Sequence, residues 1–208
     1  MALHVIDHPL IAHRLGVLRD GRTAPERFRQ LTIELSSLIA YEASRNLPTE
    51  PGTVDGPLET APVSRLAGPE PLVVPILRAG MGMLPGILSM IPYGEVAVIG
   101  LRRSEDTLEA AMYANGIPHD LGGRPVIVCD PMLATGGSLS LTCEIAEARG
   151  AGRVTALCLV AAPEGVERVL RDHPDVSLFV AHLDEHLDER GYIRPGLGDA
   201  GDRLYGRP

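Results

Sequence analysis

The chain contains no lysine and no tryptophan. All 19 of its basic residues are arginines, and two phenylalanines and five tyrosines supply its aromatic rings. A hydrophobic core must therefore rest on leucine, valine, isoleucine, alanine and methionine. The 27 acidic residues give a net charge of −8, which argues against a broad nucleic-acid-binding surface because such surfaces are strongly basic.

Cysteine is scarce, and long hydrophobic runs are missing. The three cysteines are scattered and form no C-x-x-C pair, which excludes a disulfide framework and a zinc site. Cys129 and Cys158 lie in apolar runs, where we expect buried thiols. Residues 1–7 lack the basic and apolar regions of a signal peptide, and no stretch is apolar enough to span a membrane. We therefore expect a cytoplasmic protein.

Short apolar runs alternate with helical patterns from residue 72 onward. This alternation is typical of a parallel sheet covered by helices on both faces. The runs expected to form strands are 72–77, 96–101, 126–129, 154–160 and 176–180. The expected helices are 82–90, 137–149 and 164–171. At 208 residues we expect one α/β domain, with an N-terminal arm (1–71), a core sheet (72–182) and a C-terminal flap (183–208).

The segments around this core have their own patterns. Thr23-Ala-Pro-Glu26 reads as a capping box before an amphipathic helix that runs to about residue 45. Residues 47–71 are rich in proline and glycine and predict a hairpin or loop excursion. Residues 102–124 interrupt the alternation as a long polar loop, which is usually functional or mobile. The glycine-rich tail, 182–208, predicts an irregular but ordered flap.

The segment 126–139 carries the strongest functional signal. A buried strand ends in Asp130, and Thr135-Gly-Gly-Ser138 follows at the start of a helix. Helix N-termini favour anions, and glycines let the backbone approach a ligand closely. No G-x-x-x-x-G-K or G-x-G-x-x-G motif is present, which excludes a Walker A loop and a dinucleotide fingerprint. The segment therefore predicts a sugar-phosphate site, with Asp130 near sugar hydroxyls or a metal.

Three further segments should meet this loop, since ligands bind beyond the carboxyl ends of parallel strands. A strand delivers Arg78 into a small-residue turn, where its planar group suits phosphate oxygens. Arg103 lies in the long loop and could close over a charged leaving group, although a solvated surface charge is an equal alternative. Residues 192–202 offer many backbone groups that could read the edge of a flat base.

Together these motifs resemble those of the uracil phosphoribosyltransferase family, and they span nearly the whole chain. The phosphate loop alone indicates the wider phosphoribosyltransferase group, and the C-terminal flap narrows the match. The matching stretches are His8-Pro-Leu-Ile11, Leu18-Arg-Asp20, Phe28-Arg-Gln-Leu31, Pro75-Ile-Leu-Arg-Ala-Gly80, Asp130-Pro-Met-Leu-Ala-Thr-Gly-Gly-Ser138, Ala161-Ala-Pro-Glu-Gly165 and Gly191-Tyr-Ile-Arg-Pro-Gly-Leu-Gly-Asp-Ala-Gly-Asp-Arg203.

The resemblance implies transfer of a phosphoribosyl group from 5-phosphoribosyl 1-diphosphate (PRPP) to uracil, giving UMP and diphosphate in pyrimidine salvage. The residues implied to bind PRPP are Arg78, Arg103, Asp130, Pro131, Met132, Leu133, Ala134, Thr135, Gly136, Gly137, Ser138 and Asp199. Those implied to bind uracil are Ile193, Gly198, Asp199 and Ala200. Catalysis is expected to depend on Arg78, Arg103, Asp130 and Asp199.

The resemblance also implies Mg²⁺ carried by PRPP near Asp199, with no direct side-chain ligand assigned, and in some members activation by GTP. It further implies a dimer or higher homo-oligomer on a phosphoribosyltransferase-type fold. Residues 110–117 depart from the family pattern, which leaves closure of this loop open. Two alternatives remain: a phosphoribosyltransferase for another base, such as a purine or orotate, or a non-catalytic nucleotide-sensing regulator, for instance an RNA-binding attenuator.

Overall fold

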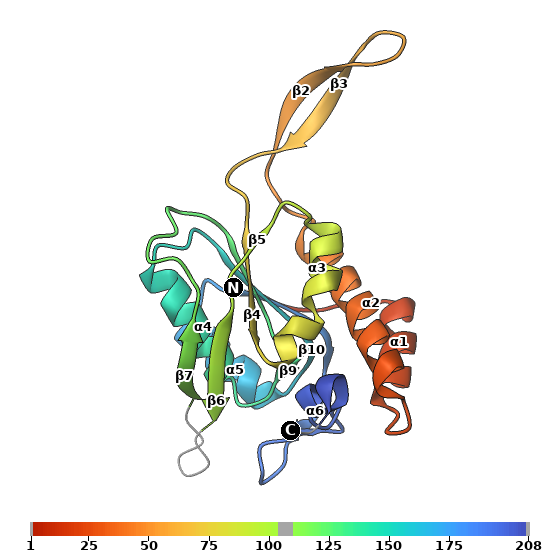
Figure 1. Ribbon diagram of the computed structural model, residues 1–208, viewed down its shortest axis with the longest axis vertical. Helices are drawn as coiled ribbons and strands as arrows, with labels where there is room; N and C mark the ends of the chain where they lie inside the picture. Colours follow the sequence, from red (N-terminus) through yellow and green to blue (C-terminus); the bar gives the residue numbers. More distant parts are fainter. Residues whose placement is uncertain (1, 104–109, 207–208) are drawn as a thin grey trace.

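The computed structural model describes residues 2–103 and 110–206, and for residues 2, 102, 103, 110 and 111 it describes the backbone alone. A mostly parallel sheet forms its centre (Figure 1). Two short strands extend it: β5 (Glu95–Val96) pairs with β4 (Leu72–Leu77), and β9 (Met132–Leu133) pairs with β10 (Val154–Ala161). The main strands, in spatial order, are β1 (Ala2–Val5), β11 (Ser177–Leu183), β10 (Val154–Ala161), β8 (Val126–Cys129), β4 (Leu72–Leu77), β6 (Ile99–Arg103) and β7 (Ala110–Asn115).

Helices cover both faces of this sheet, as expected. One core lies beneath α1 (Pro9–Arg19), α2 (Pro25–Ala43) and α3 (Leu84–Met90). The other lies beneath α4 (Gly137–Ala148) and α5 (Pro163–Asp172). All eight residues of the central strand β10 are buried, because side chains on both of its faces meet helices. The expected α/β class is confirmed.

The start of α2 differs from the expected capping box. Ala24, not Thr23, is the N-cap residue, and no side chain caps the helix. The Thr23 hydroxyl instead donates to the Val17 carbonyl oxygen, at 2.6 Å, at the end of α1. Pro25 at the first helical position removes one of the N–H groups that a cap would have to satisfy. The capping-box prediction is therefore wrong.

Several expected loops contain regular structure. The excursion 47–71, expected to be a hairpin or a loop, is a hairpin of β2 (Thr49–Asp55) and β3 (Thr60–Leu66), largely exposed on both sides. Within the polar segment 102–124, β7 pairs antiparallel with β6, so the sheet is not purely parallel. The expected strand 96–101 is divided between β5 and β6. The tail forms β12 (His186–Leu187), β13 (Ile193–Arg194) and α6 (Ala200–Tyr205), so it is less irregular than expected.

The hairpin and the C-terminal flap lie at opposite ends of the molecule (Figure 1). The flap follows the carboxyl end of β11 and places α6 beside η1 (Ala79–Gly82), the 3₁₀ turn after β4. Among the described residues no helix has the length and apolar character needed to cross a bilayer.

Candidate active site

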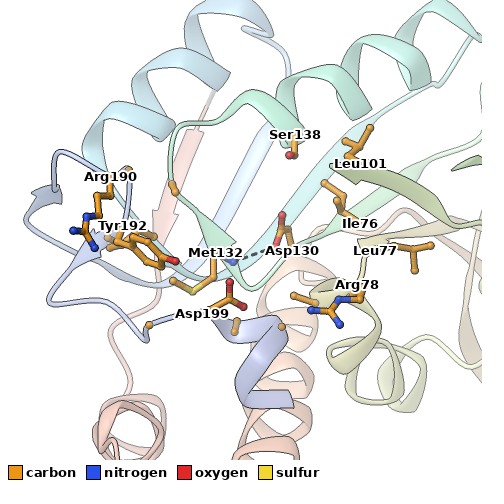
Figure 2. Close-up of a pocket in the computed structure, with 17 residues that line it drawn as sticks. Ile76, Leu77, Arg78, Leu101, Asp130, Met132, Ser138, Arg190, Tyr192 and Asp199 are labelled. Atoms are coloured by element: carbon orange, nitrogen blue, oxygen red, sulfur yellow. Dashed lines mark hydrogen bonds between the residues drawn. The ribbon is translucent and has the colours of Figure 1, made fainter. Parts of the chain in front are cut away.

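A cavity of about 470 Å³ opens at the carboxyl ends of the central strands. Arg78 follows β4, Asp130 follows β8, Ser138 lies in the first turn of α4, and Asp199 precedes α6. Figure 2 shows Asp130 between these elements, with Arg78 and Asp199 beside it. The topology thus gathers polar groups from distant parts of the chain at one edge of the sheet, as strand order predicts.

The loop after β8 has the geometry of an anion-binding turn. Its backbone is held at Asp130, whose N–H donates to the Leu157 carbonyl oxygen at 3.2 Å, while its Oδ1 accepts the Met132 N–H at 3.3 Å. Gly136, the N-cap of α4, has a φ of +77°, and a Cβ there would lie 2.9 Å from the Gly165 carbonyl oxygen. Both observations require glycine at this position.

The N-terminus of α4 faces a smaller cavity of about 40 Å³. Its lining comes mainly from the same loop and the first residues of α4, with Cys158 from β10, and it includes Asp130, Gly136, Gly137 and Ser138. The first N–H groups of a helix have no partner within the helix, and its dipole adds partial positive charge. This cavity is therefore suited to a phosphate group.

Arg78 lies where the sequence places it, at the end of β4. The peptide bond before it is cis, its side chain is about half exposed, and its Nη2 lies 3.5 Å from Asp202 Oδ1. The turn after it packs tightly, since a Cβ on Gly80 would lie 2.5 Å from the Cys129 carbonyl oxygen. Glycine at position 80 thus lets the Arg78 turn approach β8, which brings Arg78 and Asp130 to one cavity.

The flap supplies the opposite wall of the cavity. Ile193, Gly198, Asp199 and Ala200, all expected to bind the base, line it. Ile193 and Ala200 are buried, whereas the Asp199 carboxylate caps α6 by accepting the Asp202 N–H at 2.9 Å. The wall is therefore ordered backbone with apolar support, which suits a small flat base with a polar edge.

The cavity contains most of the residues expected to bind the sugar phosphate. Pro131 and Thr135 line neither cavity, but the Pro131 carbonyl oxygen accepts the N–H groups of Leu159 and Val160, both at 3.1 Å, and so holds the loop. Arg103 ends β6, and its side chain is outside the described part of the chain. The expected residues that line the larger cavity are Arg78, Asp130, Met132, Ala134, Ser138 and Asp199. Those that line the smaller cavity are Asp130, Met132, Leu133, Ala134, Gly136, Gly137 and Ser138.

Sequence reasoning missed part of the lining. Arg190 and Tyr192 line the cavity from the flap, and Leu101 lines it from β6 (Figure 2). Tyr192 lies in the segment 192–202, which was expected to meet the loop, but no separate role was expected for its side chain. No sequence signal marked Arg190, because it precedes that segment and lies among other charged residues.

The charges of the site suit a polyanion that arrives with a cation. Arg78 and Arg190 supply positive charge, while Asp130 and Asp199 supply carboxylates. No group of three or more potential ligands is gathered among the described residues. Mg²⁺ is commonly held by substrate phosphates and only one or two carboxylates, and these residues fit that arrangement.

Cysteine chemistry is not available at this site. Burial raises the pKa of Cys143 to about 12, with a smaller contribution from the charge of Glu147. Burial likewise raises the pKa values of Cys129 and Cys158, which lie closer to Asp130. At neutral pH these three thiols are protonated, so none can act as a thiolate nucleophile.

Comparison with known proteins agrees with this geometry. The family model described as uracil phosphoribosyltransferase matches residues 5–207. A protein of Beutenbergia cavernae named uracil phosphoribosyltransferase is 56% identical over 209 residues, which cover 99% of each chain. A protein of the same name from Listeria innocua is 51% identical and covers 98% of each chain.

Solved structures support the same placement. A protein from Aquifex aeolicus superposes with a TM-score of 0.93 at 38% identity and covers 99% of this chain and 98% of its own. A hypoxanthine-guanine phosphoribosyltransferase from Bacillus anthracis, 15% identical, has a TM-score of 0.51 over 74% of this chain and 78% of its own, which indicates a shared fold alone. With its sequence matched almost from end to end, this chain belongs to the uracil phosphoribosyltransferase family.

Proposed function

We propose that this protein transfers the phosphoribosyl group of PRPP to uracil, forming UMP and diphosphate. The observation that carries this proposal is a single cavity whose walls are the phosphate loop, Arg78 and the flap at Ile193 and Gly198–Ala200. The family and its relatives, all named for this activity, support the same substrates.

The donor is held by its phosphates and its sugar. The 5-phosphate lies against the N-terminus of α4, where the helix dipole and the backbone of Gly136 and Gly137 favour it. Asp130 accepts hydrogen bonds from the ribose hydroxyls. Arg78 and, from β6, Arg103 neutralise the diphosphate. Mg²⁺ bound to the diphosphate, near Asp199, would spread the negative charge that develops on the leaving group.

Bond cleavage at the anomeric carbon builds positive charge on the ribose and negative charge on diphosphate. No covalent nucleophile is required, and the protonated thiols offer none. The chain contributes positioning, by fixing the base in line with the breaking bond, and electrostatic stabilisation, by holding arginine near the departing oxygens. The flap fixes uracil through backbone groups of Gly198–Ala200 beside Ile193.

The direct test is to incubate the purified protein with labelled uracil, PRPP and Mg²⁺ and to separate the products. We expect UMP and diphosphate in equal amounts, and competition with hypoxanthine, adenine and orotate should leave uracil as the preferred base. Formation of a different nucleotide would reassign the base, and no nucleotide at all would contradict the enzyme assignment. Adding GTP to the same assay tests for activation.

We propose further that the protein acts in the cytoplasm as a homodimer or a larger homo-oligomer. The feature that supports self-association is the hairpin, which carries exposed apolar side chains, Val54, Leu58 and Leu66, away from the core. Exposed apolar surface of this kind often marks an interface, and most soluble oligomers are symmetric assemblies of one chain.

A further inference from the structure

We propose that Arg19 and Arg203 are positioning residues for the base, because together they fix two successive carbonyl groups of the flap. The inference rests on the proposed function and extends it to residues outside the cavity. Neither arginine lines the cavity. Both contact the backbone immediately before Gly198, the first residue of the Gly198–Ala200 wall.

Arg19, the last residue of α1, forms a partly buried clamp on Gly196. Its Nη2 and Nη1 lie 2.5 and 3.0 Å from the two carboxylate oxygens of Asp184, whose side chain is fully buried. The same Nη1 donates to the Gly196 carbonyl oxygen at 2.8 Å. Asp184 Oδ2 accepts the Gly196 N–H at 3.1 Å, and His182 Nε2 lies 3.6 Å from its Oδ1. Both backbone groups of Gly196 are therefore fixed by one ion pair.

The backbone conformation at position 196 also requires glycine. Its φ is +65°, and a Cβ there would lie 2.1 Å from the Ile193 carbonyl oxygen. The clamp thus acts on a residue that packs directly on Ile193, one of the residues that line the cavity. Movement of Gly196 would disturb the apolar support of the base.

Arg203, in α6, holds the next carbonyl group. Its Nη1 donates to the Leu197 carbonyl oxygen at 2.9 Å, and its Nη2 donates to the Asp20 carbonyl oxygen, just after α1, at 2.7 Å. Its guanidinium carbon lies 4.2 Å from the centre of the Phe28 ring, which is buried in α2. The guanidinium therefore has one fixed orientation, set by two hydrogen bonds and a stacked ring.

Fixing a carbonyl group also fixes the N–H that follows it. A peptide unit is planar and, when trans, directs its C=O and N–H to opposite sides. With the Leu197 carbonyl oxygen held by Arg203, the Gly198 N–H has a set direction away from that arginine. Glycine at 198, with a φ of +73°, would otherwise leave this unit free to rotate.

Uracil is the substrate that depends on such orientation. It is small and uncharged, and it has two carbonyl oxygens and two N–H groups along its edge, so correctly directed backbone donors and acceptors must supply its affinity. PRPP is held mainly by charge at Arg78 and at the loop 130–138, which the clamp does not touch. Loss of the hydrogen bonds from Arg19 or Arg203 to the flap should therefore weaken uracil binding and leave PRPP binding nearly unchanged.

Steady-state kinetics of Arg203→Met and Arg19→Lys test this inference. Arg203→Met removes the hydrogen bonds without leaving a buried carboxylate unpaired, and Arg19→Lys keeps the charge beside Asp184 but loses the two-pronged geometry. We expect the KM for uracil to rise at least tenfold in Arg203→Met and the KM for PRPP to stay within twofold. Arg203→Lys should recover part of the uracil affinity.

Arg14→Met is the matched control. Arg14 also lies in α1 and forms an ion pair of 2.7 Å with Glu34, but it has no contact with the flap. This variant should keep both KM values. Circular dichroism and thermal melting establish that each variant is folded.

Three outcomes would overturn the inference: an unchanged KM for uracil in folded Arg203→Met, an equal rise of both KM values, or the same change in Arg14→Met. Failure of the proposed function is distinguishable, because the parent protein would then form no UMP from uracil.

Discussion

At the scale of single residues, Arg78 offers the clearest separation between function and stability. Its side chain is about half exposed, and its ion pair with Asp202, at 3.5 Å, is long. Exposed pairs of this kind contribute little to folding. We therefore expect Arg78 to act in the cavity, where its guanidinium is proposed to meet phosphate oxygens.

Replacing Arg78 with methionine should reduce kcat/KM by about 10²–10³, the usual cost of losing one electrostatic contact in a transition state. The melting temperature should stay close to that of the parent. Arg45→Met, which removes an exposed ion pair with Glu42 on α2, is the control and should leave the kinetics unchanged. Near-parental turnover of Arg78→Met would contradict the role assigned to Arg78.

Gly136 provides a second prediction, since its left-handed backbone shapes the loop that we propose to bind the 5-phosphate. Gly136→Ala should raise the KM for PRPP tenfold or more, because the new Cβ would meet the Gly165 carbonyl oxygen and shift the loop. Gly122→Ala is the matched control: Gly122 also has a positive φ, +55°, but has no neighbour within 4 Å of its Cβ position.

Both alanine variants should lose about 1–2 kcal/mol of stability from the left-handed backbone. Only Gly136→Ala should change the kinetics. An equal effect of both on the KM for PRPP would show that the phosphate loop has no special part in binding the donor.

At this scale the sequence was informative where a residue type has few physical uses. An acid at the end of an apolar run and a Gly-Gly pair at a helix start predict that Asp130, Gly136 and Gly137 share one site, and all three line the smaller cavity. Arg190 could not be found this way, because an arginine in a polar stretch looks the same whether it faces solvent or a cavity.

At the scale of elements, burial on both faces decided which strands were predictable. Strands β4 and β8 were predicted with their observed bounds, because central strands of a covered sheet are apolar at every position. The antiparallel strand β7 was not anticipated, because it lies at the sheet edge and contains Tyr113 and Asn115. The capping-box prediction at Thr23 failed for a different reason. A capping motif depends on neighbouring residues alone, whereas the Thr23 hydroxyl donates to the Val17 carbonyl oxygen across the turn between α1 and α2.

The contact between α2 and α3 gives a prediction at this scale. A Cβ on Gly86 would lie 2.3 Å from the Ile33 carbonyl oxygen, so Gly86→Ala should force the two helices apart and cost about 1–3 kcal/mol of unfolding free energy. Chemical denaturation measures this directly.

Gly16→Ala serves as the matched control, since Gly16 lies in α1 with no neighbour within 4 Å of its Cβ position. Alanine there should stabilise the protein by about 0.5–1 kcal/mol through helix propensity. A neutral Gly86→Ala would mean that α3 does not pack as closely on α2 as described.

At the scale of the whole molecule, the hairpin stands out because it adds almost nothing to the core. Its strands pair with one another and not with the main sheet, and Leu58 at its tip is 96% exposed. A segment that costs conformational entropy but buries little must gain its stability elsewhere.

Light scattering of Leu58→Asp, and of a Val54→Asp, Leu58→Asp double variant, checks whether a second copy supplies that stability. We expect the parent to have at least twice the mass of one chain. The double variant should dissociate to monomers at a higher protein concentration than the parent does. Thr53→Asp, which adds the same charge at another exposed position, is the control. A monomeric parent would refute self-association.

The clamp on the flap has a consequence for biosynthesis. The wall that we propose to bind the base contains Ile193 and Gly198–Ala200, and neighbouring flap residues bond to Arg19 and Asp20 at the end of α1. During translation, Arg19 and Asp20 are synthesised before the sheet strands that lie between them and the flap in the sequence. The cavity can therefore form only after residues 193–203 have been synthesised and have reached α1, so a nascent chain that ends before them should not bind uracil.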